Sequence, residues 1–260
     1  SGKYVLPGLI DVHTHMELPF MGTTSADDFE RGSIAAACGG VTTYIDFAIQ
    51  SRGESLLAAV EEWKKKADPK TCVDYSLHLA VTDLNESTMK EVPSIIEYGV
   101  PSFKLFMPYR KEGLMSDDAT IFSLLSETQK YGGVVCVHAE NAYLLESLAE
   151  KFLREGKTSP EYHAKSRPAF VEGEAIGRAI SLNREARGFL YIVHMSTLLG
   201  RRAVRDAQYA GLQVYAETCP HYLTLTDDKY LEPEGANYVM SPPLRKREDV
   251  EELWRGIADG

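Results

Sequence analysis

Two hydrophobic patterns alternate along the chain. Short apolar runs rich in β-branched residues predict strands, and longer stretches with apolar residues every three or four positions predict amphipathic helices. This alternation is typical of βα units arranged around a parallel sheet. The predicted strands are Tyr4 to His15, Val41 to Phe47, Asp74 to Ala80, Ser102 to Met107, Val134 to His138, Phe189 to His194 and Leu212 to Thr218. The predicted helices are Ala26 to Cys38, Glu54 to Ala67, Ser87 to Tyr98, Ile121 to Tyr131, Ala142 to Glu155, Glu172 to Ala186 and Leu198 to Ala210.

The near-constant spacing of these units favours one fold class, an α/β protein built as a (β/α)8 TIM-type barrel. About seven of the eight strands are recognisable, and an amphipathic stretch from Arg247 to Ile257 follows the last of them. We therefore expect an incomplete barrel that forms a single domain over residues 1–260. An open doubly wound sheet is the alternative. No strand is followed by a glycine-rich phosphate-binding fingerprint, which argues against the commonest function of that alternative.

Composition narrows the class of partner. The 260 residues are 44% hydrophobic and 25% charged, the profile of a soluble globular protein. The net charge of -10 is spread along the chain, so we expect a small-molecule partner and neither nucleic acid nor a membrane surface. No apolar run reaches the roughly 20 residues of a membrane span. Four scattered cysteines predict reduced, buried thiols in a cytoplasmic protein, without a disulfide framework.

Candidate chemistry recurs at the carboxyl ends of the predicted strands, where barrel enzymes build their active sites. The first strand ends in His13-Thr14-His15, and side chains two residues apart on a strand point to the same side. Two imidazoles on one face can chelate one metal ion, although a single His-x-His pair is weak support for a metal site. The fifth and sixth strands end near His138 and His194. Four histidines at three strand ends favour a metal site over isolated core histidines.

The fourth strand places Lys104 among apolar neighbours, where an unpaired ammonium is costly. An ion pair with a carboxylate is one explanation. A reactive amine whose pKa is lowered by burial is the other.

Four segments together resemble the hydantoinases and dihydropyrimidinases of the amidohydrolase superfamily. They occur in that family's order and with its approximate spacing over essentially the whole chain. The segments are Pro7-Gly8-Leu9-Ile10-Asp11-Val12-His13-Thr14-His15, Ser102-Phe103-Lys104-Leu105-Phe106-Met107-Pro108-Tyr109, Val137-His138-Ala139-Glu140-Asn141 and Ser241-Pro242-Pro243-Leu244-Arg245.

The resemblance implies a cofactor of two Zn²⁺ ions per subunit. It implies that His13 and His15 bind the more buried ion, that His138 and His194 bind the second, and that Lys104, as N6-carboxylysine, bridges them. The implied activity is metal-dependent hydrolysis of cyclic amides. It opens 5,6-dihydropyrimidines to N-carbamoyl-β-amino acids, as in pyrimidine catabolism, or hydantoins to N-carbamoyl amino acids.

Two further residues match substrate-contacting positions of the family. The resemblance implies that Tyr109 polarises the substrate carbonyl and stabilises its oxyanion, and that Ser241 holds the ring amide. It also implies a homotetramer.

The sequence departs from the family in two respects. No eighth strand with the family's metal-binding aspartate is found before Gly260, and the segments of its small β-sandwich domain are absent, so we expect the chain to be a fragment. Two alternatives stay open. One is a cyclic amidase of the dihydroorotase or allantoinase type, although no arginine follows His-x-His between Met16 and Glu30 as a dihydroorotase requires. The other is a non-catalytic scaffold relative.

Several other residues are interpreted as structural. His78 within the third strand and His163 in a predicted loop are given structural or solvated roles, and Cys219 is expected to be a buried thiol and not a nucleophile. The apolar segment Met16 to Gly22 has two interpretations, packing against a neighbouring loop or lining the substrate pocket.

Overall fold

The computed structural model describes residues 2–20 and 22–260. Met21, within the apolar segment Met16 to Gly22, lies outside the described residues. The chain divides into two compact units, residues 1–104 and residues 105–260. The boundary falls within one strand, β6 (Ser102–Phe106).

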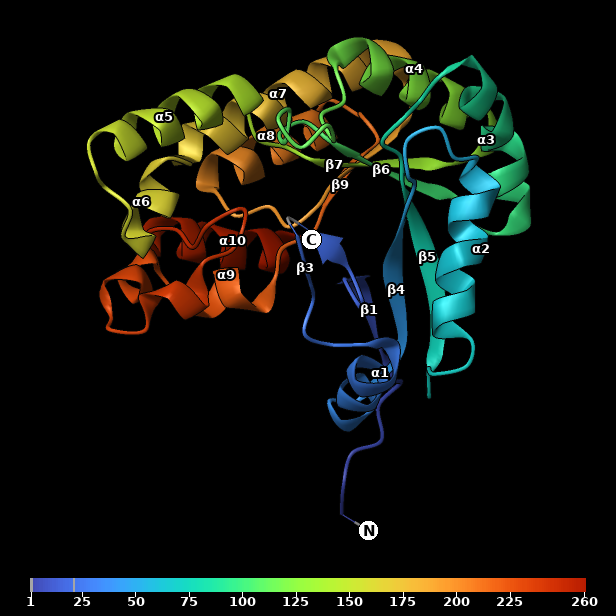
Figure 1. Cartoon of the computed structure of the whole chain (residues 1–260), viewed down its shortest axis with the longest axis horizontal. Helices are drawn as coiled ribbons and strands as arrows, with labels where there is room; N and C mark the ends of the chain where they lie inside the picture. Colours follow the sequence, from blue (N-terminus) through green and yellow to red (C-terminus); the bar gives the residue numbers. More distant parts are fainter. Residues whose placement is uncertain (1, 21) are drawn as a thin grey trace. The chain divides into compact units, whose positions relative to one another are not determined.

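The first unit contains parallel strands that pair in chain order: β1 (Leu9–Thr14), β4 (Val41–Ile49), β5 (Asp74–Ala80) and β6. A short hairpin of β2 (Pro19–Phe20) and β3 (Thr23–Thr24) follows β1. The connecting helices are α1 (Phe29–Cys38), α2 (Leu56–Ala67) and α3 (Glu86–Tyr98). In Figure 1, α2 lies along β4 and β5 and beside α3.

The helices of this unit begin and end where local chemistry dictates. Ser55 accepts a hydrogen bond from the Ala58 N–H at the start of α2, and Asn85 and Thr88 form a capping box at the start of α3. The α3 helix ends at Gly99, whose φ of 105° is in the left-handed region. Each cap therefore fixes where the chain turns back toward the sheet.

The second unit continues the pattern with β7 (Val134–His138), β8 (Phe189–Ile192) and β9 (Val214–Ala216), which pair in parallel. Its α7 and α8 lie side by side, as do α9 and α10 (Figure 1). The helices are α4 (Asp118–Thr128), α5 (Ala142–Arg154), α6 (Pro160–Lys165), α7 (Ala169–Ala186), α8 (Leu198–Tyr209), α9 (Pro220–Thr224) and α10 (Arg247–Asp259), and the 3-10 turns are η1 (Gln129–Tyr131), η2 (Asp227–Leu231) and η3 (Gly235–Tyr238).

Strand order decides between the two predicted architectures. The sheet runs β1-β4-β5-β6-β7-β8-β9, so successive βα units add strands on the same side throughout. A doubly wound sheet reverses direction at a switch point, whereas a (β/α)8 barrel does not. The order confirms the predicted α/β class and the βα arrangement of a barrel.

All seven predicted strands are present, with some corrected boundaries. The first strand begins at Leu9 and not at Tyr4, because residues 2–8 pair with no strand and the Tyr4 side chain is 97% exposed. The prediction that His163 lies in a loop was wrong. It lies in α6, where Ser159 and Pro160 form the expected start of a helix.

The prediction of buried thiols was largely wrong. Only Cys136 is buried, while Cys38 and Cys72 are exposed and Cys219 is half-buried. Cys38 ends α1 on its solvent side, which its small-residue neighbours could not indicate. Across the described ranges 2–20 and 22–260, the four cysteines form no disulfide.

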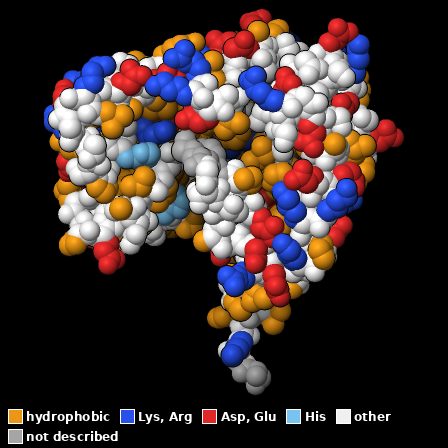
Figure 2. Space-filling view, in the orientation of Figure 1, with side chains coloured by type: hydrophobic (Ala, Val, Ile, Leu, Met, Phe, Trp, Pro, Cys, Tyr) orange, Lys and Arg blue, Asp and Glu red, His pale blue; other side chains and the backbone are white. Residues whose placement is uncertain are grey.

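The charged side chains are spread over the surface, as their spread along the sequence predicts. Figure 2 shows acidic and basic side chains interspersed over the visible face, with no large area of one sign. No helix within the described part of the chain has the length and apolar character needed to cross a bilayer.

Candidate metal and substrate site

Three predicted metal ligands of the first unit surround one aromatic ring, that of Phe47 on β4. The ring centroids of His13 and His15 lie 4.5 Å and 4.9 Å from the Phe47 centroid. The Lys104 Nζ lies 4.9 Å from the same centroid, and the lysine is only 1% exposed, as predicted for this strand. His13, His15 and Lys104 therefore belong to one local site, formed by the carboxyl end of β1 and the middle of β6.

The geometry of the histidine pair fits a shared metal ion. The Nε2 atoms of His13 and His15 are 3.2 Å apart. Two nitrogen ligands of a tetrahedral Zn²⁺, each about 2.05 Å from the ion, lie about 3.3 Å from each other. The pair is therefore spaced as two ligands of one ion are spaced.

A buried aspartate holds the segment that carries His15. Asp46 is 1% exposed, and its Oδ2 accepts hydrogen bonds from the Thr14 hydroxyl and the Met16 backbone N–H, both at 2.8 Å. Burial raises the pKa of Asp46 to about 6, against the opposing effect of these hydrogen bonds. Sequence reasoning missed Asp46, although a lone carboxylate within an apolar strand was a visible signal.

His78 also contacts the Phe47 ring. Its ring centroid is 4.6 Å from that of Phe47. Its Nδ1 lies 2.6 Å from Ser102 Oγ and its Nε2 lies 3.0 Å from the Val12 carbonyl oxygen. These contacts give His78 a part in joining β1, β5 and β6.

The second unit brings the other two predicted histidine ligands together. The rings of His138, at the end of β7, and His194, after β8, are 4.4 Å apart between centroids and nearly perpendicular. His194 has a φ of 40°, a left-handed conformation that is strained for a non-glycine residue. Its backbone N–H donates to Glu217 Oε1 at 3.1 Å, which helps to hold this conformation.

Glu140 and Arg167 are functional candidates that sequence reasoning did not assign. Glu140 is completely buried, and its Oε2 lies 2.7 Å from His138 Nε2 and 2.6 Å from Arg167 Nη1. Burial alone raises the pKa of Glu140, but the Arg167 charge and the His138 contact outweigh it and lower the pKa to about 2. The two-residue spacing from His138 was a usable signal for Glu140, whereas nothing in the sequence pointed to Arg167.

The predicted substrate residues Tyr109 and Ser241 lie together in the second unit. Tyr109 has a φ of 67°, and its ring centroid is 5.2 Å from that of His138. Burial raises the pKa of Tyr109 to about 12, although the Arg167 charge and a hydrogen bond with Ser241 oppose the rise. The phenol is therefore protonated and able to donate a hydrogen bond across the physiological pH range.

His163 adjoins this pair. Its Nε2 lies 2.7 Å from the Met240 carbonyl oxygen and 3.4 Å from Ser241 Oγ. Burial and the nearby Arg167 charge lower the pKa of His163, so its ring is neutral at physiological pH. His163 thus supports the backbone next to Ser241, a role that its incorrect assignment to a loop concealed.

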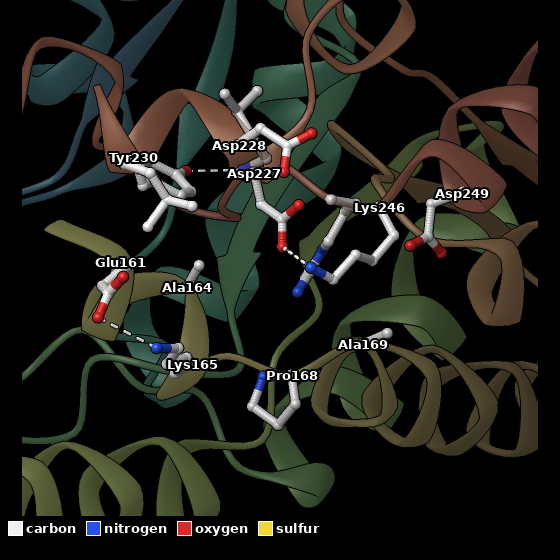
Figure 3. A pocket seen from close by; sticks show the side chains of 13 residues that line it. Glu161, Ala164, Lys165, Pro168, Ala169, Asp227, Asp228, Tyr230, Lys246 and Asp249 are labelled. Atoms are coloured by element: carbon white, nitrogen blue, oxygen red, sulfur yellow. Dashed lines mark hydrogen bonds and ion pairs between the residues drawn. The ribbon is translucent and has the colours of Figure 1, made fainter. Parts of the chain in front are cut away.

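The second unit also contains a cavity of about 480 Å³ (Figure 3). None of the predicted metal or substrate residues lines it. Two of its cations are already paired, Lys246 with Asp227 at 2.7 Å and Lys165 with Glu161 at 3.1 Å.

The four predicted histidine ligands occur as two pairs, one in each unit. Within residues 2–20 and 22–260, no group of three or more His, Cys, Asp or Glu side chains is arranged to hold a metal ion. The first pair has Lys104 near it, and the second has Tyr109, Glu140 and Arg167.

Comparison with known proteins defines the class first. A profile described as the amidohydrolase family matches residues 4–231, and the chain therefore belongs to the amidohydrolase family. Among curated proteins, the D-hydantoinase of Geobacillus stearothermophilus is 46% identical over 264 residues, which cover 100% of this chain and 56% of that protein. The dihydropyrimidinase of Rattus norvegicus is 43% identical over 249 residues, which cover 94% of this chain and 48% of that protein.

A solved structure gives the same result for the fold. The dihydropyrimidinase from Brevibacillus agri matches with a TM-score of 0.96 and 45% identity, over 98% of this chain and 56% of that one. These relatives confirm the resemblance to hydantoinases and dihydropyrimidinases and identify the fold as a partial TIM-type barrel. The chain spans about half the length of the relatives that it matches.

Proposed function

We propose that the protein to which this chain belongs is a zinc-dependent cyclic amidase that opens dihydropyrimidine or hydantoin rings. The observation that carries the proposal is the pair of His13 and His15 nitrogens 3.2 Å apart, beside a lysine that is almost completely buried. Burying a lysine ammonium costs free energy, which a chemical role for the amine would explain. Two imidazole nitrogens at this spacing suit one metal ion. The similarity to D-hydantoinases and dihydropyrimidinases supports the substrate class.

Five side chains would hold the two metal ions. His13 and His15 would bind one Zn²⁺, His138 and His194 the other, and Lys104, carboxylated on Nζ, would supply an anionic bridge. When bound, two zinc ions activate water at neutral pH and act as Lewis acids. The four histidines would bind as neutral nitrogen ligands, whereas carboxylation would turn the Lys104 amine into an anionic oxygen ligand. The burial of Lys104 would help by keeping competing water away.

Tyr109 would act on the substrate carbonyl. Its hydroxyl is held in the protonated form because burial keeps its pKa at about 12. A phenol that donates a hydrogen bond where negative charge develops contributes about 3 kcal/mol to transition-state stabilisation. Tyr109 lies in a loop with a φ of 67°, a strained backbone conformation that would orient its side chain toward the substrate.

Ser241 would orient the ring. Its neighbour Met240 is anchored by His163, and the carbonyl of Pro242 accepts a hydrogen bond from Tyr222 at 2.6 Å. The backbone on both sides of Ser241 is therefore fixed, as a segment that recognises a planar cyclic amide requires.

The test uses the full-length protein. Elemental analysis should find about two zinc ions per chain, and hydrolysis of 5,6-dihydrouracil or hydantoin should be abolished by chelation and restored by zinc with bicarbonate. A protein that binds no metal and is inert toward both rings, even with added zinc and bicarbonate, would contradict the proposal and favour a non-catalytic scaffold.

A further inference from the structure

A connected set of buried charged side chains contacts His138 and the loop that follows His194. Glu140 has no exposed surface, and its Oε2 contacts both His138 Nε2 and Arg167 Nη1. An ionised carboxylate only accepts hydrogen bonds. It therefore favours the His138 tautomer that carries its proton on Nε2 and its lone pair on Nδ1.

The same set continues from Arg167 to a second arginine. The backbone carbonyl of Arg167 accepts a hydrogen bond from Arg245 Nη1. Arg245 is 6% exposed, donates from Nε to Ser196 Oγ at 2.9 Å, and lies 3.5 Å from Glu172 Oε2. Arg245 thus joins the segment after α6 to the loop after β8.

Glu172 completes the set at the strand end that carries His194. It is 2% exposed, and its Oε1 accepts hydrogen bonds from the backbone N–H groups of Ser196 and Thr197, both at 3.0 Å. Thr197 Oγ1 donates to the same oxygen at 2.7 Å. Because these residues directly follow Met195, Glu172 fixes the backbone two residues beyond His194.

The charges of the set balance, with two carboxylates and two guanidinium groups. Removing one member of a buried ion pair leaves its partner with an uncompensated charge. The set spans α7, the segment before it, the loop after β8 and the segment that contains Arg245. Such a set resists independent movement of the two strand ends.

Resting on the proposed function, we propose that Glu140, Arg167, Arg245 and Glu172 are positioning residues that hold His138 and His194 in metal-binding geometry. Glu140 acts on the His138 ring directly. Glu172 acts on His194 through the backbone of Ser196 and Thr197, and the two arginines couple the carboxylates. Partners of this kind around metal ligands change metal affinity by roughly 10- to 100-fold when they are removed.

The experiment compares Glu140→Gln, Arg167→Met and Arg167→Lys with the wild-type full-length protein. Zinc affinity is measured by competition with a chelator, and folding by thermal denaturation of the metal-free protein. The His138 tautomer is read from ¹⁵N chemical shifts of the metal-free protein at mildly alkaline pH.

Arg201→Met is the matched control. Arg201 is 7% exposed and pairs with Glu252 at 3.3 Å and with Asp259, so it is also a buried arginine in an ion network of the second unit. Neither Glu252 nor Asp259 is a predicted metal ligand or a neighbour of one along the chain. We expect this variant to lower thermal stability and to leave zinc affinity and the His138 tautomer unchanged.

We expect Glu140→Gln and Arg167→Met to weaken zinc binding by roughly 10- to 100-fold and to mix the His138 tautomers, with Arg167→Lys intermediate. The proposal is overturned if both variants lose stability as Arg201→Met does while the zinc affinity and tautomer of the wild type persist. If the wild type itself binds no zinc, the proposed function fails. The tautomer comparison then still decides whether the set positions His138.

Discussion

Lys104 shows most directly how one residue links burial to chemistry. It is 1% exposed and lies over the Phe47 ring between strands of the first unit. Burying a lysine ammonium costs free energy, so its presence here calls for a chemical explanation. In the proposed enzyme that explanation is an amine that reacts with carbon dioxide to give a metal-bridging carboxylate.

We therefore predict that Lys104→Met in the full-length protein lowers the zinc content below two ions per chain and abolishes ring opening. A thioether cannot be carboxylated, whereas its length and apolar character suit the site. Elemental analysis and hydantoin hydrolysis measure the two effects. Lys90→Met is the control, since the Lys90 side chain is 73% exposed. Unchanged zinc content in Lys104→Met would refute the bridging role.

Tyr109 gives a second prediction at this scale. Tyr109→Phe removes only the hydroxyl, so we expect kcat to fall by about 100- to 1,000-fold with little change in stability. Tyr143→Phe, at a position that is 63% exposed, should have no effect on kcat. Steady-state kinetics with both rings measure the loss. An unchanged kcat in Tyr109→Phe would remove the oxyanion role from this residue.

The ends of secondary-structure elements carry most of the proposed metal ligands. His138 ends β7, His194 follows β8, and the His-x-His segment ends β1. Buried carboxylates stand at these ends: Asp46 beside β1 and Glu172 beside the loop after β8. They satisfy backbone N–H groups that have no strand partner, so the strand ends are rigid where a metal site needs them to be.

A helix start offers a test of local energetics that is independent of function. Asp117 Oδ1 accepts a hydrogen bond from the Thr120 N–H at the start of α4, at 2.8 Å, and this bond lowers the pKa of Asp117. Because the pKa is lower in the folded state than in the unfolded state, the ionised cap stabilises the fold above the ordinary pKa of aspartate. That contribution is lost as the pH falls through the folded-state value.

We expect Asp117→Ala to reduce the free energy of unfolding by about 1 kcal/mol at neutral pH and by less in acid. Asp117→Asn keeps an acceptor at the cap and should lose most of the pH dependence with little loss at neutral pH. Urea denaturation at several pH values measures both. Equal stability losses for Asp117→Ala at neutral and acid pH would contradict the charge argument.

At the scale of the whole molecule, metal binding and folding are coupled. A ligand that binds only the folded state stabilises it by about 2.7 kcal/mol when its concentration is 100 times Kd. We therefore predict that chelation lowers the melting temperature of the full-length protein and that zinc restores it, as measured by calorimetry. Magnesium, which prefers oxygen ligands, should not restore it. A melting temperature that is insensitive to chelation would argue against bound zinc.

The sequence by itself determined the α/β class, the seven strands, the histidines at strand ends and the lysine within β6, because the period of apolar residues along a strand is a local property. It also indicated the family, since the four motifs are short and lie in a fixed order. Its errors arose where the pattern was weak. The start of β1 was placed too early because residues 4–8 are apolar although exposed, and the burial of Cys38 and Cys72 was inferred from neighbours that do not face the core.

Only the tertiary structure decided how the site residues are held. Arg245 donates a hydrogen bond to the backbone carbonyl of Arg167, although the two residues are 78 positions apart along the chain. No periodicity in the sequence links them. The left-handed backbone of His194 likewise depends on a contact from another segment, since its N–H donates a hydrogen bond to Glu217. Local sequence predicts which residues are buried at strand ends, whereas pairing between buried charges depends on the three-dimensional packing of segments that are distant along the chain.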